Sequence, residues 1–155
     1  MLARLFTYVF VSLSGDQLGF FKNIKIIFSD IKIAHTVFAL PFAVMSAFLA
    51  AEGMPGLGKL IWILIAMFGA RNGAMAFNRI VDSKLDRLNP RTKDRALPAR
   101  KSTAKQYWVF LIPSSFIFLF SAYMLNSLAF VLSPIALVII FGYSFAKRFT
   151  SLSHL

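Results

Sequence analysis

Three oxygen-bearing side chains recur at four-residue intervals in the middle of the chain: Asn78, Asp82 and Asp86. On an α-helix, residues four apart are offset by only about 40° and about 6 Å, so all three would share one face. Two carboxylates and an amide oxygen form an all-oxygen ligand set. Such a set suits Mg²⁺, an ion that keeps several waters and bridges to phosphates. The spacing therefore favours a magnesium site.

Cationic side chains surround this acidic face. Arg91 and Arg95 are also four residues apart, and Arg79, Lys84 and Arg87 flank the acids. Arginine binds phosphate oxygens through two parallel hydrogen bonds, and a bound metal ion cancels further negative charge. Acids and arginines in this arrangement are typical of a diphosphate that is bound through a metal ion, next to apolar helices that would hold a hydrocarbon tail.

The same charges also have a simpler interpretation. Acids and bases three or four residues apart on a helix pair with each other, as Asp82 would with Arg79, and exposed pairs of this kind contribute little. Asn78 could merely end the second apolar helix. For an arbitrary sequence this surface pairing is the more frequent outcome, so the pattern alone leaves both interpretations open.

The composition identifies the class of protein that carries these residues. Of the 155 residues, 58% are hydrophobic and only 15% are charged, with a net charge of +11. The high hydrophobicity excludes disorder, and the apolar runs are too long for the core of a small soluble nucleic-acid-binding domain. The absence of cysteine excludes disulfides, thiolate catalysis and zinc sites built on cysteine. We therefore predict an integral membrane protein.

Four apolar spans predict an all-α fold, a bundle of four transmembrane helices. The spans are Ile33–Ala51, Leu60–Phe77, Tyr107–Leu125 and Leu128–Ala146. Each approaches the roughly 20 residues that cross about 30 Å of hydrocarbon, and a backbone in lipid must satisfy its own polar groups, which favours helices. Pro41, Pro113 and Pro134 fall inside spans and are expected to kink them.

The basic residues predict the orientation in the membrane. They gather before the first span, between the second and third, and after the fourth, whereas Lys59 lies on the other side and Arg71 lies within a span. The positive-inside rule then places both termini and the motif loop 78–106 in the cytoplasm of a multi-pass inner-membrane protein. Residues 1–32 form a cytoplasmic or interfacial segment, or begin with a cleaved signal peptide, and residues 33–155 form the four-helix part.

Arginine within a membrane helix is costly, and it usually faces a polar cavity or a partner. Arg71 stands within the second span, close to its cytoplasmic end. We expect Arg71 to face a cavity, although snorkelling of its side chain toward the interface is the alternative.

Three stretches resemble the UbiA superfamily of membrane aromatic prenyltransferases, and most closely its 4-hydroxybenzoate polyprenyltransferases. The run 78–98, NRIVDSKLDRLNPRTKDRALP, is similar to the first aspartate-rich motif of that family. The run 35–42, HTVFALPF, resembles its first-helix signature, and the run 142–150, GYSFAKRFT, resembles the end of its fourth helix. The three stretches follow the order of the family.

The resemblance implies a reaction and a set of binding residues. The reaction is Mg²⁺-dependent transfer of a polyprenyl group from a prenyl diphosphate to an aromatic acid such as 4-hydroxybenzoate, in ubiquinone or menaquinone biosynthesis. The implied metal ligands are Asn78, Asp82 and Asp86. The implied diphosphate-binding residues are Arg71, Arg91 and Arg95, and those for the aromatic acid or the diphosphate are Lys147 and Arg148. Arg95 could instead form a helix–loop salt bridge, and the Lys147–Arg148 pair could simply anchor the membrane helix. No catalytic residue is assigned.

The chain also departs from the family, whose members have about nine transmembrane helices and a second aspartate-rich motif. No Asp or Glu follows Asp94. We therefore expect the chain to be roughly the N-terminal half of such an enzyme and inactive alone. It would be the product of an interrupted gene or a misread stop, or one part of a split enzyme in which a second chain supplies the missing helices. The non-enzymatic alternative is a small membrane protein or subunit whose basic loop binds anionic lipid or a partner. A proton-coupled transporter is disfavoured, because no span carries Asp or Glu.

Overall fold

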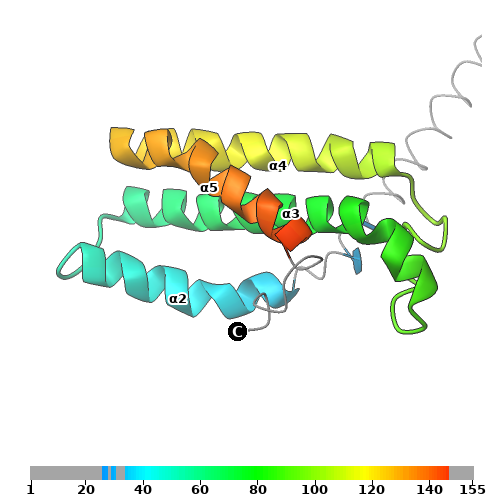
Figure 1. Ribbon diagram of the computed structural model, residues 1–155. Helices are drawn as coiled ribbons and strands as arrows, with labels where there is room; N and C mark the ends of the chain where they lie inside the picture. The colour runs from blue at the N-terminus through cyan, green and yellow to red at the C-terminus, as the bar shows by residue number, and fades with distance from the viewer. Residues whose placement is uncertain (1–25, 28, 31–33, 147–155) are drawn as a thin grey trace, which may run out of the picture.

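The computed structural model describes residues 26–27, 29–30 and 34–146, and the elements within these ranges are helical. The four long helices are α2 (Ala34–Ala50), α3 (Leu57–Leu88), α4 (Ala104–Leu125) and α5 (Ser127–Ala146). Each overlaps one of the four predicted spans, which confirms the all-α class, and α3 extends beyond its span at both ends. In Figure 1, α3 lies in the middle of the bundle, with α2 and α4 on either side of it and α5 crossing obliquely. Most of residues 1–32, and Lys147 and Arg148, lie outside the described residues.

The helices have the composition of membrane spans. Three of them, α3, α4 and α5, are long and apolar enough to cross a membrane, and α2 is a shorter apolar helix of 17 residues. Large apolar side chains face outward, such as Phe116 and Val138, which are 67% and 72% exposed. Small residues lie inside instead, as expected where helices pack in lipid. Pro41, Pro113 and Pro134 lie within α2, α4 and α5 without ending them.

Helix α3 extends well beyond its apolar part. Its 32 residues measure about 48 Å at 1.5 Å per residue, whereas the hydrocarbon layer is about 30 Å thick. The predicted span ended at Phe77, but the helix continues to Leu88, so Asn78 does not end it and the irregular loop begins only at Asn89. The motif residues therefore lie on a rigid helical extension. Phe77, just before it, stacks on Phe141 of α5 with ring centroids 4.6 Å apart.

Two glycines allow α3 and α4 to pack closely together. A Cβ atom at Gly69 would lie 2.8 Å from the Ser114 carbonyl oxygen and 2.9 Å from the Phe118 backbone nitrogen. Gly73, one turn later, would place its Cβ 3.5 Å from the Ser115 hydroxyl. Small residues four apart are a common means of bringing membrane helices into backbone contact. The α3–α4 pair is thus the packed centre from which the motif extends.

Gly69→Ala is expected to destabilise the bundle. Because the atoms that its methyl group would meet belong to the backbone, the helices themselves must move apart, at a cost of about 1–3 kcal/mol. Thermal unfolding in detergent would measure the loss. Gly142→Ala is the matched control, since a Cβ on Gly142 has no neighbour within 4 Å, and helix propensity makes that change neutral or slightly favourable. Equal melting temperatures for the two variants would contradict the packing argument.

Candidate functional site

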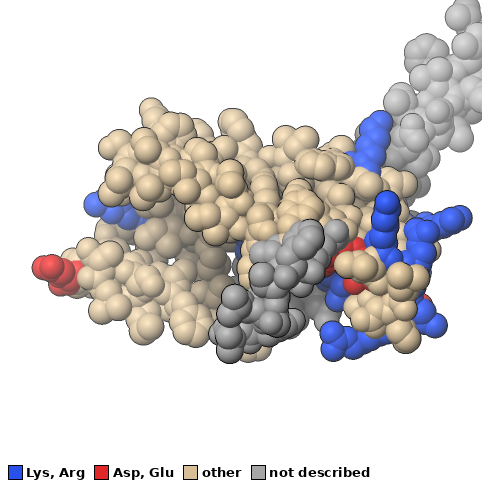
Figure 2. Space-filling view, in the orientation of Figure 1, with Lys and Arg blue, Asp and Glu red and all other residues tan. Residues whose placement is uncertain are grey.

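One end of the bundle is strongly basic. Figure 2 shows the Lys and Arg side chains gathered around the end at which α3 leaves the bundle and the loop 89–103 follows. The opposite end carries Glu52 and Lys59, in and just after the turn between α2 and α3. The charge asymmetry that the sequence predicts is therefore present in the folded molecule.

The acids of the motif lie on the inner side of the α3 extension. Asp82 and Asp86 are 8% and 7% exposed, and Asn78 is partly buried. A buried carboxylate needs a cation or several hydrogen bonds to compensate for lost hydration. Their burial therefore contradicts the simple view of these acids as members of a solvated surface.

Asp86 is held by Arg95 from the loop. Both carboxylate oxygens accept hydrogen bonds from Arg95 Nη1, each at 2.8 Å, and the Arg95 side chain remains 30% exposed. The backbone carbonyl of Asp86 accepts a further hydrogen bond from the Thr92 hydroxyl at 3.1 Å. The helix–loop salt bridge that the sequence allowed for Arg95 is thus present. It folds the loop back over the end of α3.

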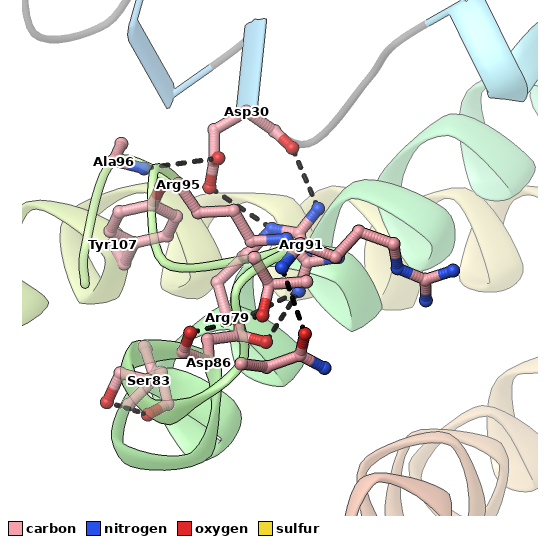
Figure 3. A network of polar contacts seen from close by, with 11 residues as sticks. Asp30, Arg79, Ser83, Asp86, Arg91, Arg95, Ala96 and Tyr107 are labelled. Carbon is pink, nitrogen blue, oxygen red and sulfur yellow. Dashed lines mark hydrogen bonds and ion pairs between the residues drawn. The ribbon is translucent and has the colours of Figure 1, made fainter. Parts of the chain in front are cut away.

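Arg91 has a different environment. The Asn89 side-chain oxygen accepts a hydrogen bond from the Arg91 backbone N–H at 3.0 Å, which forms the tight turn expected of an Asn–Pro sequence. Arg91 is exposed, and its guanidinium points away from the Asp86–Arg95 pair (Figure 3). The turn therefore separates the two arginines: Arg95 faces the helix, and Arg91 faces outward from the loop.

Asp30 is the residue of this site that sequence reasoning missed. Its Oδ2 accepts a 2.6 Å hydrogen bond from the Tyr107 hydroxyl and lies 3.1 Å from Arg79 Nε. Its Oδ1 accepts from the Ala96 backbone N–H at 3.3 Å, and its carbonyl accepts from Arg79 Nη2 at 2.9 Å (Figure 3). The partners are between 49 and 77 residues away in sequence, beyond the reach of any spacing rule. The available signal was an isolated acid just before the first apolar span.

The remaining predicted residues are only partly located. Arg71 is partly buried on α3, seven residues before Asn78, which is two helical turns or about 10 Å along the same side of the helix. Lys147, Arg148 and the side chain of His35 lie outside the described residues. Within the described ranges, no three His, Cys, Asp or Glu side chains come together as a metal cluster. A metal ion at the motif would therefore depend on two carboxylates and one amide.

That donor set is chemically suited to Mg²⁺. Its members are all oxygen donors, they lie on one helix at intervals of four residues, both carboxylates are buried, and that of Asp86 is paired with Arg95. Mg²⁺ is usually held by one or two carboxylates and completed by substrate phosphates and water. Asn78, Asp82 and Asp86 fit this pattern, with the bound anion supplying the other ligands.

Comparison with known proteins shows the family of the chain. The UbiA prenyltransferase family model matches residues 39–155. The 4-hydroxybenzoate octaprenyltransferase of Vibrio parahaemolyticus is 36% identical over 110 residues, which cover 69% of this chain and 38% of that protein. The protein of the same name from Psychromonas ingrahamii is 33% identical over 107 residues, 69% of this chain and 37% of that protein. The apo structure of a UbiA homolog from Aeropyrum pernix K1 covers 79% of this chain and 44% of its own, with 39% identity and a TM-score of 0.74.

The chain thus spans less than half the length of these relatives. The family match covers α3, α4, α5, the motif and most of α2. The chain belongs to the UbiA prenyltransferase family.

Proposed function

We propose that this chain binds the diphosphate of a polyprenyl donor together with Mg²⁺, for transfer of the prenyl group to an aromatic acid such as 4-hydroxybenzoate in quinone biosynthesis. The observation that carries the proposal is the pair of buried acids on α3, Asp82 and Asp86, at the basic end of an apolar bundle. The names of the relatives support the acceptor and the polyprenyl donor.

Asn78, Asp82 and Asp86 would hold Mg²⁺. When bound, Mg²⁺ would neutralise the diphosphate and stabilise the charge that develops as it leaves the prenyl carbon. The helical extension of α3 gives these donors a fixed mutual spacing. Because it rises beyond the apolar part of the helix, the diphosphate would bind at the membrane surface while the prenyl chain stays in the apolar bundle.

Arg95 gives the site a way to exchange charge partners. It binds both oxygens of Asp86 through one nitrogen, and its side chain is the less buried member of the pair. When Asp86 serves as a metal ligand, Arg95 can turn to the diphosphate oxygens, where arginine forms charge-assisted hydrogen bonds. After this exchange both Asp86 and Arg95 still have a partner of opposite charge. Leaving the buried Asp86 carboxylate without one would cost about 3–5 kcal/mol.

The other cations of the site have roles that follow from their positions. Arg91 faces outward from the loop, free of the helix, and would approach the diphosphate from the solvent side. Arg71 lies two turns deeper on α3 and would contact the diphosphate from the membrane side. Lys147 and Arg148 would bind the aromatic carboxylate or the diphosphate, a role that rests on the resemblance of the run 142–150.

The proposed orientation places the basic end of the bundle in the cytoplasm. The loop 89–103 and the end of α3 would then face the cytoplasm at the inner membrane, as the positive-inside rule requires. Water-soluble aromatic acids would reach the site directly from that side. The variant Lys93→Cys would test the orientation. Labelling of the new cysteine in intact cells would be compared with its labelling after lysis.

Binding of a prenyl diphosphate by the full chain in nanodiscs tests the proposal. Geranylgeranyl diphosphate is expected to bind only in the presence of Mg²⁺, to be released by EDTA, and to be displaced by inorganic pyrophosphate with Mg²⁺. The competing function, binding of anionic lipid by the basic surface, predicts attachment that follows lipid charge and salt and ignores Mg²⁺. That second result would overturn the proposal.

Arg91→Ala is expected to weaken diphosphate binding by about tenfold. A charge-assisted hydrogen bond contributes about 1.5–3 kcal/mol, and Arg91 makes no side-chain contact that stabilises the described fold. Lys93→Ala is the matched control, because Lys93 is exposed in the same loop and loses the same charge. Equal losses in both variants would mean that only the general charge of the loop matters. Thermal unfolding should be unchanged in both.

A further inference from the structure

Asp30 connects the three parts of the chain that build the motif. Its carboxylate and carbonyl accept from Arg79 of α3, from Ala96 of the loop and from Tyr107 of α4. The Asp30 and Arg79 side chains are only 9% and 4% exposed, and Tyr107 is fully buried. One side chain and its carbonyl therefore join three separate elements.

The carboxylate that pairs with Arg79 matters for the motif, because Arg79 lies beside the motif acids. It lies three residues before Asp82 and seven before Asp86 on the same helix. Residues three apart on a helix are neighbours, and a buried guanidinium requires a counter-charge. Asp30 supplies that charge, through Oδ2 at 3.1 Å and the carbonyl at 2.9 Å. Without Asp30, the nearest carboxylate along α3 would be that of Asp82.

Ala96 links Asp30 to the loop arginine. Its backbone N–H donates to Asp30 Oδ1, and the residue before it, Arg95, binds both oxygens of Asp86. Two adjacent loop residues thus contact different acids: Ala96 contacts Asp30, and Arg95 contacts Asp86. A displacement of the chain at Ala96 would displace the Arg95 guanidinium relative to α3.

From these contacts we infer that Asp30 is a positioning residue of the diphosphate site. It holds the Arg79 guanidinium, three residues before Asp82 on α3, and it fixes the loop that carries Arg95. The inference rests on the proposed function and extends it to a residue 48 positions before the motif begins. Asp30 is not itself proposed as a ligand of the substrate or the metal ion.

Asp30→Asn preserves shape and removes the charge that holds Arg79. We expect the Mg²⁺ concentration that half-saturates geranylgeranyl diphosphate binding to rise about tenfold, the size typical of partners that orient metal ligands. Tyr107→Phe is the matched control, since it removes a 2.6 Å hydrogen bond to the same carboxylate but leaves the pair of Asp30 and Arg79 in place. It should lower the melting temperature without changing the Mg²⁺ requirement.

The double variant Asp30→Asn with Arg79→Gln separates positioning from mere stability. Removing both charges leaves no cation to misdirect, so the Mg²⁺ requirement should return to within about threefold of wild type. A double variant as impaired as Asp30→Asn would overturn the inference, and so would a single variant with the wild-type requirement. If Asp30→Asn fails to fold, the double variant alone decides. Failure of the wild-type chain to bind at any Mg²⁺ concentration would instead overturn the proposed function itself.

Discussion

Asp82→Asn will abolish Mg²⁺-dependent binding of a prenyl diphosphate, weakening it by at least about 100-fold, while the helices stay folded. Partners that only orient a metal ligand cost 10–100-fold when removed, and Asp82 is proposed as a ligand itself. Asparagine has nearly the same shape as aspartate and keeps one oxygen acceptor, so no cavity forms at this residue, which is 8% exposed. Titration of geranylgeranyl diphosphate at fixed Mg²⁺ gives the loss, and thermal unfolding gives the stability.

Asp94→Asn is the control for this prediction. Asp94 is an exposed acid in the loop after the motif, and its replacement makes the same change in net charge. Its binding should stay within about twofold of wild type, as for an isolated surface charge in high dielectric. A loss in Asp94→Asn equal to that in Asp82→Asn would mean that affinity follows net charge and not the position of the acid on α3.

The helices and the basic end could be predicted from the sequence because both depend on local composition. Apolar runs of sufficient length predict a span wherever they occur, and cations sort by side without reference to the fold. The residue at which α3 ends was harder to predict. Hydropathy falls after Phe77, which ended the predicted span, yet the helix continues to Leu88 because its hydrogen bonds do not require apolar side chains. The four-residue spacing of Asn78, Asp82 and Asp86 was the better guide there.

The partners of the charged residues could be predicted only in part. The structure pairs Arg79 with Asp30, 49 residues earlier, a partner that no spacing rule could offer. Arg95 and Asp86 are nine residues apart, and they meet because a turn at Asn89 reverses the chain. Contacts of this kind depend on how the loop folds and how the helices pack, which residue spacing does not encode. The family resemblance supplied the identity of the motif, but not these connections.

Exchanging the two charges of the Asp86–Arg95 pair will separate folding from binding. Asp86→Arg alone and Arg95→Asp alone each place two like charges in the contact, where a hydrogen-bonded charge pair is worth about 1.5–3 kcal/mol. Both single variants should therefore unfold at lower temperature. The double variant restores an Arg–Asp pair between the helix and the loop, and we expect it to recover most of the lost stability in thermal unfolding.

Binding should not recover in the double variant. Arginine offers no oxygen to a metal ion, and the carboxylate now stands on the loop instead of one turn beyond Asp82 on α3, so the set of oxygen donors on the helix is broken. We expect a loss of at least about 100-fold in Mg²⁺-dependent binding of geranylgeranyl diphosphate, similar to that of Asp82→Asn. A double variant that regained both stability and binding would show that the pair serves only to hold the loop. A stable protein without binding would show that binding needs the carboxylate on α3 and the guanidinium on the loop, and not only the pair that they form.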